Sequence, residues 1–348
     1  MLTVRVSCPA ALVPQVRAAL LAEPAISSLS LEPTSGLRPP GGVFVADLPR
    51  EAANDVIDRL VGLGVAEEGA IVVQSAPTWV SKPALAAEEA APGSSADAVV
   101  WSDVVERAYD ETELTWTYGS FMILAMALAA IAIVTDSVIL VIGAMVIGPE
   151  FMAITALGLA LVRRRASLFR QALRTLVIGF VVAMAVITAA CLLGRLAGLI
   201  TSEQILAARP GTAFIYTPNV WSFIVAVIAA AAGVLALTSQ RASGLVGVFI
   251  SVTTIPAAAN ICLGLAFGLW SEVAGSSLQL AINITGMALA GWGTLALQQF
   301  VWSRISRRDS PAPTASGGVS PRGRARPRRQ LPVDQRSPER HRRTLPRP

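Results

Sequence analysis

The sequence has 348 residues, of which 53% are apolar and only 15% are charged, and its net charge is +5. Soluble domains carry about a quarter charged residues, so this composition argues against an ordinary soluble protein. The single histidine, His341, lies in an arginine-rich tail, and the three cysteines are far apart in the sequence. These features argue against histidine-based catalysis and against zinc sites. We expect no enzyme activity, no catalytic residues, no metal and no cofactor.

Charge divides the chain into three segments. The net charge is −9 for residues 1–118, +4 for residues 119–303 and +10 for residues 304–348. The modest total therefore averages an acidic head, a middle with few charges and a basic tail.

The head, residues 1–75, predicts a small α+β domain because alternating apolar residues are typical of strands and apolar residues at helical spacing of helices. The predicted order is strand 2–7, helix 9–21, strands 26–31 and 42–47, helix 51–63 and strand 70–74. This βαββαβ order is that of a ferredoxin-like fold. The N-terminus lacks the apolar stretch of a signal peptide, so we expect a cytoplasmic domain that regulates or dimerises.

Two segments connect the head to the apolar middle. Residues 76–98 are rich in Ala, Pro, Ser and Glu, which predicts a linker. Residues 99–117 predict an amphipathic helix, and its flanking residues Trp101, Trp116 and Tyr118 favour a position at the membrane interface.

The middle, residues 118–303, contains six apolar segments that approach the roughly 20 residues of a transmembrane helix. They are residues 118–134, 138–162, 173–193, 219–237, 244–269 and 278–302. Arginines follow the second, fourth and sixth segments, which fall on one side if the spans alternate. The positive-inside rule makes that side cytoplasmic, so we expect both termini inside.

The second and fifth segments resemble each other. Each has a glycine-rich half, a mid-span proline (Pro149 or Pro256) and a Leu-Gly-Leu-Ala block at residues 157–160 or 263–266. Each is the middle member of a group of three spans, so the groups would enter the membrane from opposite sides. This pattern predicts two inverted three-helix repeats, and paired broken helices indicate a transport site.

Residues 116–160, with Thr-Asp-Ser-Val at 135–138 and Ile-Gly-Ala-Met-Val-Ile-Gly-Pro at 142–149, resemble the domain of unknown function 389 family of uncharacterised hydrophobic domains. Its later motifs are similar to residues 208–210, Asn219, residues 244–256 and Asn283. The resemblance covers about residues 100–300. It implies a bacterial inner-membrane protein with a cytoplasmic N-terminal domain, without implying a reaction.

Glu150 is the most informative polar residue in the middle. It follows Gly148 and Pro149, which predict a helix break, and lies roughly 18 Å into the second segment, near the centre of a core about 30 Å thick. A carboxylate there must be protonated, paired or facing a cavity. We interpret it either as the cap of a broken helix or as a group that handles a proton or cation.

Other polar residues complete a hypothetical ion or substrate site. Asp136 with Ser137 is expected to form the N-cap before Val138, or Asp136 is expected to line an outer vestibule. Thr253, Thr254, Asn260 and Asn283 join helices by hydrogen bonds or, if the two breaks meet, lie opposite Glu150.

The partners expected from the sequence are the bilayer and a small ion or solute. The arginines from Arg163 to Arg174 and those of the tail, residues 304–348, should attract anionic lipid. We predict a disordered tail, a homo-oligomer and no nucleic-acid binding, because no aromatic residue interrupts the basic tail.

We therefore predict a six-span α-helical membrane protein of two inverted repeats with a ferredoxin-like cytoplasmic domain. It would transport an ion or small polar solute. The alternative is a non-transporting sensor or scaffold whose head binds a ligand or partner.

Overall fold

The structure is a computed structural model that describes residues 1–76, 79–91, 98–207, 209–217, 219–238 and 253–309. These residues form two compact units, the first ending at Ala91 and the second covering the described residues from 98 to 309. The predicted tail beyond Asp309 and part of the fifth apolar segment lie outside the described residues.

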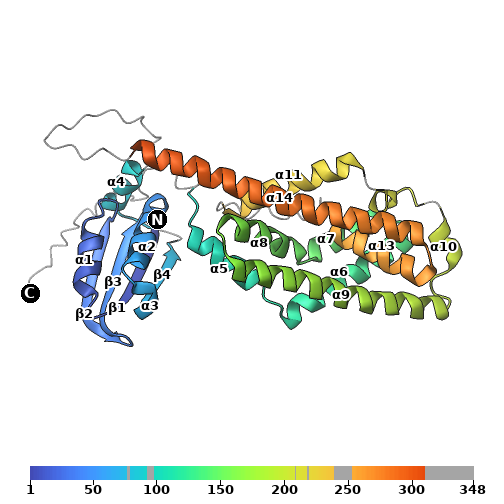
Figure 1. Ribbon diagram of the computed structural model, residues 1–348, viewed down its shortest axis with the longest axis horizontal. Helices are drawn as coiled ribbons and strands as arrows, with labels where there is room; N and C mark the ends of the chain where they lie inside the picture. The colour runs from blue at the N-terminus through green and yellow to red at the C-terminus, as the bar shows by residue number, and fades with distance from the viewer. Residues whose placement is uncertain (77–78, 92–97, 208, 218, 239–252, 310–348) are drawn as a thin grey trace, which may run out of the picture. The chain divides into compact units, whose positions relative to one another are not determined.

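The first unit is a four-stranded antiparallel sheet with helices (Figure 1). Its strands are β1 (Leu2–Pro9), β2 (Ser28–Leu37), β3 (Pro40–Leu48) and β4 (Ala70–Ser75), in the order β2-β3-β1-β4. Its helices are α1 (Val13–Leu21), α2 (Arg50–Gly62), α3 (Val65–Glu68) and α4 (Lys82–Ala90). Alternate residues of β1 are buried, and Val6 lies opposite Phe44 of β3 in the core.

The element order agrees with the expected strands and helices, with three differences, the first being the short unpredicted helix α3. Strands β2 and β3 extend further towards each other than predicted, so the connection at Arg38 and Pro39 is short. The predicted linker contains helix α4, whose N-terminus is capped by the Ser81 hydroxyl accepting from Ala84 N at 3.2 Å. Alanine and glutamate favour helices, and a capping serine adds a local start signal.

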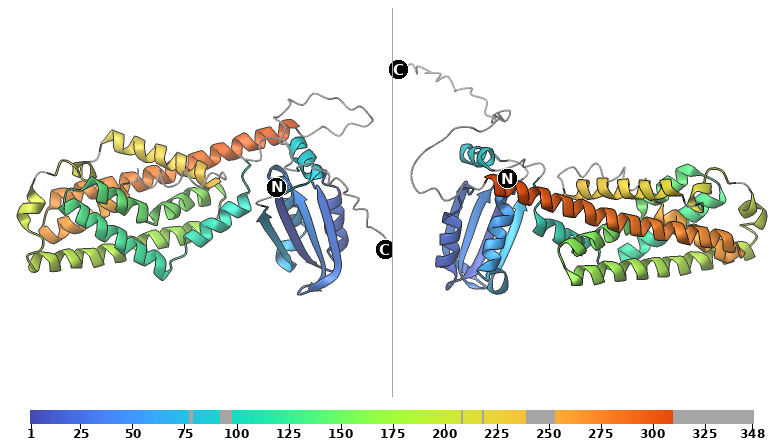
Figure 2. Two further views of the ribbon diagram at one scale, coloured as in Figure 1. Left: turned by 180° about the vertical axis from the view of Figure 1, so that it is seen from behind. Right: turned by 45° about the horizontal axis from the view of Figure 1, so that its top comes forward.

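The second unit is helical, and Figure 2 shows it from two further sides. Its long helices are α5 (Trp101–Glu111), α6 (Trp116–Val134), α7 (Val138–Ile147), α8 (Glu150–Val162), α9 (Ala166–Leu196), α11 (Val220–Thr238), α13 (Thr254–Phe267) and α14 (Trp270–Asp309). The short helices α10 (Ser202–Leu206) and η1 (Ala213–Ile215) lie between α9 and α11.

Within the described ranges, three helices are long and apolar enough to cross a membrane: α6, α9 and residues Trp270–Val301 of α14. Helices α7 and α8 together pass the same test as one broken span, bent by 52°. The apolar stretches Val220–Ala236 and Thr254–Phe267 are shorter. Several helices of the described chain are therefore long and apolar enough to cross a membrane.

Several helix boundaries differ from the prediction; α14, for example, begins at Trp270 rather than at residue 278. Helix α9 begins at Ala166, so Arg170 and Arg174 belong to the same helix as the apolar span rather than to a separate connection. Helix α14 continues to Asp309, so the first six residues of the predicted tail are helical. In both cases arginine, a good helix former, extends an existing helix beyond its apolar part.

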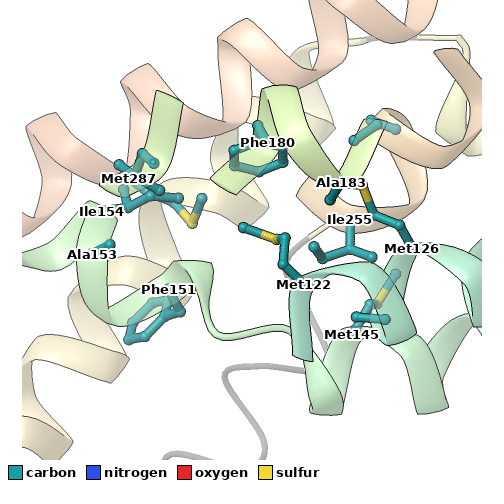
Figure 3. Packing of buried hydrophobic residues seen from close by; sticks show 14 of the residues in the cluster. Met122, Met126, Met145, Phe151, Ala153, Ile154, Phe180, Ala183, Ile255 and Met287 are labelled. Carbon is teal, nitrogen blue, oxygen red and sulfur yellow. The ribbon is translucent and has the colours of Figure 1, made fainter. Parts of the chain in front are cut away.

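The half-helices α8 and α13 lie at the centre of the packing. Helix α8 packs on α9 and α14, whereas α13 packs on α14, α9 and α6. Figure 3 shows part of this core, in which Met122 and Met126 of α6 lie near Ile255 of α13. Three consecutive alanines of α13, residues 257–259, are fully buried, which indicates close helix contacts.

Candidate functional site

Two helices begin inside the second unit, each at a proline. Helix α7 ends at Ile147, and α8 begins at Glu150 after Gly148 and Pro149. Helix α13 begins at Thr254, with Pro256 in its first turn. Proline is tolerated in a first turn because those N–H groups have no intrahelical partner. Both prolines therefore lie at helix starts, and we refer to α8 and α13 as the half-helices.

The two half-helices meet at their first residues. Glu150 is only 2% exposed, and its Oε1 accepts a hydrogen bond of 2.5 Å from Thr254 Oγ1. Among the described residues, its Oε2 has no hydrogen-bond partner. The positive end of the α8 dipole favours a carboxylate at this position. One carboxylate oxygen of Glu150 is thus held by Thr254, and the other is buried without a hydrogen bond among the described residues.

Gly148 allows this contact because it has no side chain. A Cβ at this position would collide with Glu150 Oε2 and would lie 2.8 Å from Ile255 Cγ1. The hydroxyl of Tyr118, on α6, is a further buried polar atom without a hydrogen bond within the described ranges. The contact at Glu150 itself combines residues of α8 and α13.

Thr253 turns away from Glu150 towards α14. Its hydroxyl accepts from Asn283 Nδ2 at 2.7 Å and from Gln279 Nε2 at 3.4 Å. These three residues line a cavity of about 230 Å³ together with Asn219 and Ser222. The cavity is therefore lined by amide and hydroxyl groups. Its residue Thr253 directly precedes Thr254, the hydrogen-bond partner of Glu150.

Asn260 belongs to a third cluster. Its Nδ2 donates to Ser276 Oγ at 2.9 Å and to Glu272 Oε2 at 3.2 Å, and Arg209 donates to its Oδ1 at 3.5 Å. Arg209 also forms an ion pair with Glu272, and its guanidinium lies over the Tyr216 ring. Both polar residues, Arg209 and Asn260, are buried.

These clusters follow one face of α14. The spacing of Glu272, Ser276, Gln279 and Asn283 places them on one side of a helix, and their partners Asn260 and Thr253 lie on α13. The antiparallel pairs 260–276 and 253–283 show that this polar seam runs along the α13–α14 contact. From Glu272 to Asn283, the polar seam is roughly 16 Å long along α14.

Asp136 lies in none of these three clusters. Its carboxylate accepts from Gly211 N at 3.2 Å and from Thr212 Oγ1 at 2.9 Å, which ties the α6–α7 turn to the segment before α11. Of the two residues expected to cap α7, Ser137 is the N-cap and accepts from Leu140 N, whereas Asp136 bonds to Gly211 and Thr212. Asp136 has a positive φ of 47°, a conformation that aspartate tolerates.

The structure thus brings Glu150, Thr254 and the two breaks together. Thr253 and Asn283 form the neighbouring cluster, whereas Asn260 and Asp136 lie elsewhere. Sequence reasoning missed Arg209, Glu272 and Ser276 as members of the seam. The regular 4-3-4 spacing of polar residues on α14 is the signal that would have found the last two.

Comparison with known proteins gives one family match. Residues 145–289, from the end of α7 to the middle of α14, match the family model described as Domain of unknown function (DUF389). No curated protein and no solved structure matches the chain. The matched residues include both helix breaks and the whole polar seam. The resemblance to this family inferred from the sequence is therefore confirmed over residues 145–289.

Proposed function

We propose that this protein moves an ion or a small polar solute across the bacterial cytoplasmic membrane. The observation that carries the proposal is the contact between Glu150 and Thr254, the first residues of two buried half-helices. Broken helices that meet inside a membrane protein offer helix-dipole ends and free polar groups to a substrate. A buried carboxylate has a large desolvation penalty, so it is most readily explained by a functional role.

The crossed packing of the half-helices supports an inverted repeat. Helix α8, from the first group of three, packs on α14 of the second group, and α13, from the second group, packs on α9 of the first. Such an exchange is expected when two halves are related by an axis in the membrane plane. Helices α6, α9 and α14 and the broken pair α7–α8 give four spans, and we propose that α11 and α13 are two more. We further propose that both termini are cytoplasmic.

The polar seam supports a route to the site. Its groups connect Glu272, at the start of α14, to Thr253, next to Glu150's partner Thr254. Oxygens and amides along such a seam can replace part of the hydration of a small ion or solute. The Arg209–Glu272 ion pair would close the outer end of the route in this conformation.

The first unit would then regulate or dimerise this transporter. We assign it to the ferredoxin-like class because its strand order β2-β3-β1-β4 and its βαββαβ connections agree with that class. In this proposal the protein acts by binding and conformational change rather than by covalent catalysis. We also propose that it assembles as a homo-oligomer.

The experiment that tests transport uses purified full-length protein in liposomes and records charge movement under imposed proton or sodium gradients. Glu150→Gln is compared with the natural sequence and with Glu203→Gln, which removes the same charge from an exposed position on α10. We expect current from the natural protein and from Glu203→Gln, but not from Glu150→Gln.

Equal currents from all three proteins would exclude Glu150 as the ion-handling group. No current from any of them, with insertion and folding verified, would exclude proton and sodium transport. That result would favour the sensor or scaffold.

A further inference from the structure

The end of α5 is fixed to the start of α9 by side-chain hydrogen bonds. Gln171 Nε2 donates to Tyr109 O at 2.9 Å, and Thr175 Oγ1 donates to Thr112 O at 2.7 Å. The Tyr109 hydroxyl and Ser167 Oγ lie 2.6 Å apart. These bonds join residues about 60 positions apart, so the space between the two helices has defined walls.

A cavity of about 610 Å³ lies between these helices, and charges of both signs line it. Arg170 and Arg174, one turn apart on α9, form its basic side, while Asp110 and Glu113 form its acidic side. Among the described residues, none of the four has an ion pair, although Arg107 and Asp103 on the same α5 are paired at 3.0 Å. The cavity therefore keeps opposite charges apart, with room between them.

The cavity continues into an apolar surface. Leu114 lines it and is exposed, and Leu173, Val177 and Val181 are exposed along the following turns of α9. Trp116, at the start of the α6 span, is 90% exposed, as expected of an aromatic residue at the membrane interface. An occupant with a charged head and apolar chains would match both parts of this surface.

We propose that this cavity binds the phosphoethanolamine headgroup of a zwitterionic membrane phospholipid. The phosphodiester lies between Arg170 and Arg174, whose planar guanidinium groups suit phosphate oxygens, and the ammonium group lies near Asp110 and Glu113. The acyl chains extend along Leu173, Val177 and Val181. The two carboxylates disfavour a headgroup of net negative charge, so this site differs from the general anionic-lipid attraction expected for the arginines.

The proposal is tested by native mass spectrometry of delipidated full-length protein titrated with phosphatidylethanolamine, phosphatidylglycerol or phosphatidylcholine of equal chain length. We expect phosphatidylethanolamine to bind most tightly. Arg170→Gln with Arg174→Gln should weaken its binding by at least about tenfold, since two charge-assisted contacts are lost. Arg165→Gln, an exposed arginine outside the cavity, should leave it unchanged.

The decisive variant combines Asp110→Asn and Glu113→Gln, because the side-chain hydrogen bonds that join α5 to α9 come from other residues. We expect its preference to shift from phosphatidylethanolamine to phosphatidylglycerol, because the repulsion of anionic headgroups is removed. An unchanged preference would overturn the proposal, as would equal binding of all three lipids by the natural protein. Equally tight binding of soluble phosphoethanolamine would overturn the lipid assignment.

Circular dichroism and the elution volume of each variant establish that it is folded. The binding readout is independent of transport, so loss of the lipid site and absence of current are separate outcomes.

Discussion

Arg209 donates from Nη2 to both carboxylate oxygens of Glu272, at 2.6 and 2.7 Å, although 63 residues separate them in the sequence. The arginine side chain is 3% exposed and the glutamate 19%, so water screens this pair weakly. The pair joins the segment before α11 to the first turn of α14.

Removing one partner of this pair should destabilise the protein strongly. Arg209→Gln leaves a mostly buried carboxylate without its cation, and we expect a loss of about 3 kcal/mol in unfolding free energy. The double variant Arg209→Gln with Glu272→Gln should recover much of this loss. Thermal unfolding in detergent provides the comparison, with Glu203→Gln as the control. Equal stability of the single and double variants would show that the two charges are not coupled.

A side chain at Gly158 should separate α8 from α14. A Cβ there would lie 2.7 Å from the backbone nitrogen of Trp292, which cannot move without the helix. We expect Gly158→Ala to reduce the unfolding free energy by about 1–3 kcal/mol. Gly293→Ala is the matched control, because a Cβ at that position meets no heavy atom within 4 Å. A neutral Gly158→Ala would contradict the close approach of the two helices.

Transport should depend on the hydroxyl group of Thr254 more than on the shape of its side chain. Thr254→Val keeps the branched side chain but removes the donor to Glu150 Oε1, whereas Thr254→Ser retains it. If Glu150 handles the transported ion, we expect roughly tenfold lower transport for the valine variant, since hydrogen bonds to charged groups contribute about 1.5–3 kcal/mol. Liposome currents with both variants test this. Similar currents for valine and serine would exclude the hydrogen bond as a determinant.

Asp136 should act as a structural tie. Asp136→Ala removes the acceptor of the Gly211 and Thr212 bonds and places alanine at a φ of 47°. We expect a loss of about 2–3 kcal/mol, combining the lost bonds with backbone strain. Asp136→Asn, which retains an acceptor oxygen and tolerates this φ, should lose less. The difference is measured by thermal unfolding, and an equal loss for both variants would argue against this account.

The native cysteines should not react with thiol reagents. Cysteines introduced at chosen positions can therefore report the membrane orientation. Cys8, Cys191 and Cys262 are all buried, and burial also raises the pKa of the Cys8 thiol. A raised pKa lowers the thiolate fraction at neutral pH, and the thiolate is the reactive form. In intact cells, Glu203→Cys should react with an impermeant maleimide and Arg165→Cys should not. The opposite result would reverse the proposed orientation.

The sequence predicts a helix break beside a buried Glu150, because proline, glycine and depth in an apolar segment are local signals. The expectation that Thr253, Thr254 and Asn260 lie opposite Glu150 depended on the inverted repeat. In the structure Glu150 contacts Thr254, whereas Thr253 and Asn260 bond to residues of α14. Asn260 lies almost two helical turns after Thr254, or roughly 9 Å along α13, so the two cannot reach the same carboxylate. Such separation follows only once the helix start is known.

The Arg209–Glu272 pair could not be found in the same way. Both residues lie in connections predicted on the outer side, where isolated charges are usually solvated. Only the packing of α13 and α14 shows that these connections are folded over a polar seam. The short helix α4 was missed because a composition rich in alanine, proline and glutamate is shared by linkers and helices.

The contact between Glu150 and Thr254 has a consequence for how the chain is made. Synthesis proceeds from the N-terminus, and 104 residues separate the carboxylate from its donor. At roughly 5–20 residues per second, Glu150 leaves the ribosome about 5–20 seconds before Thr254. During that interval α8 also lacks α14, one of the two helices that cover it. The first three apolar segments are therefore incompletely packed until α13 and α14 have been synthesised. Only then can Glu150 be buried in its contact with Thr254.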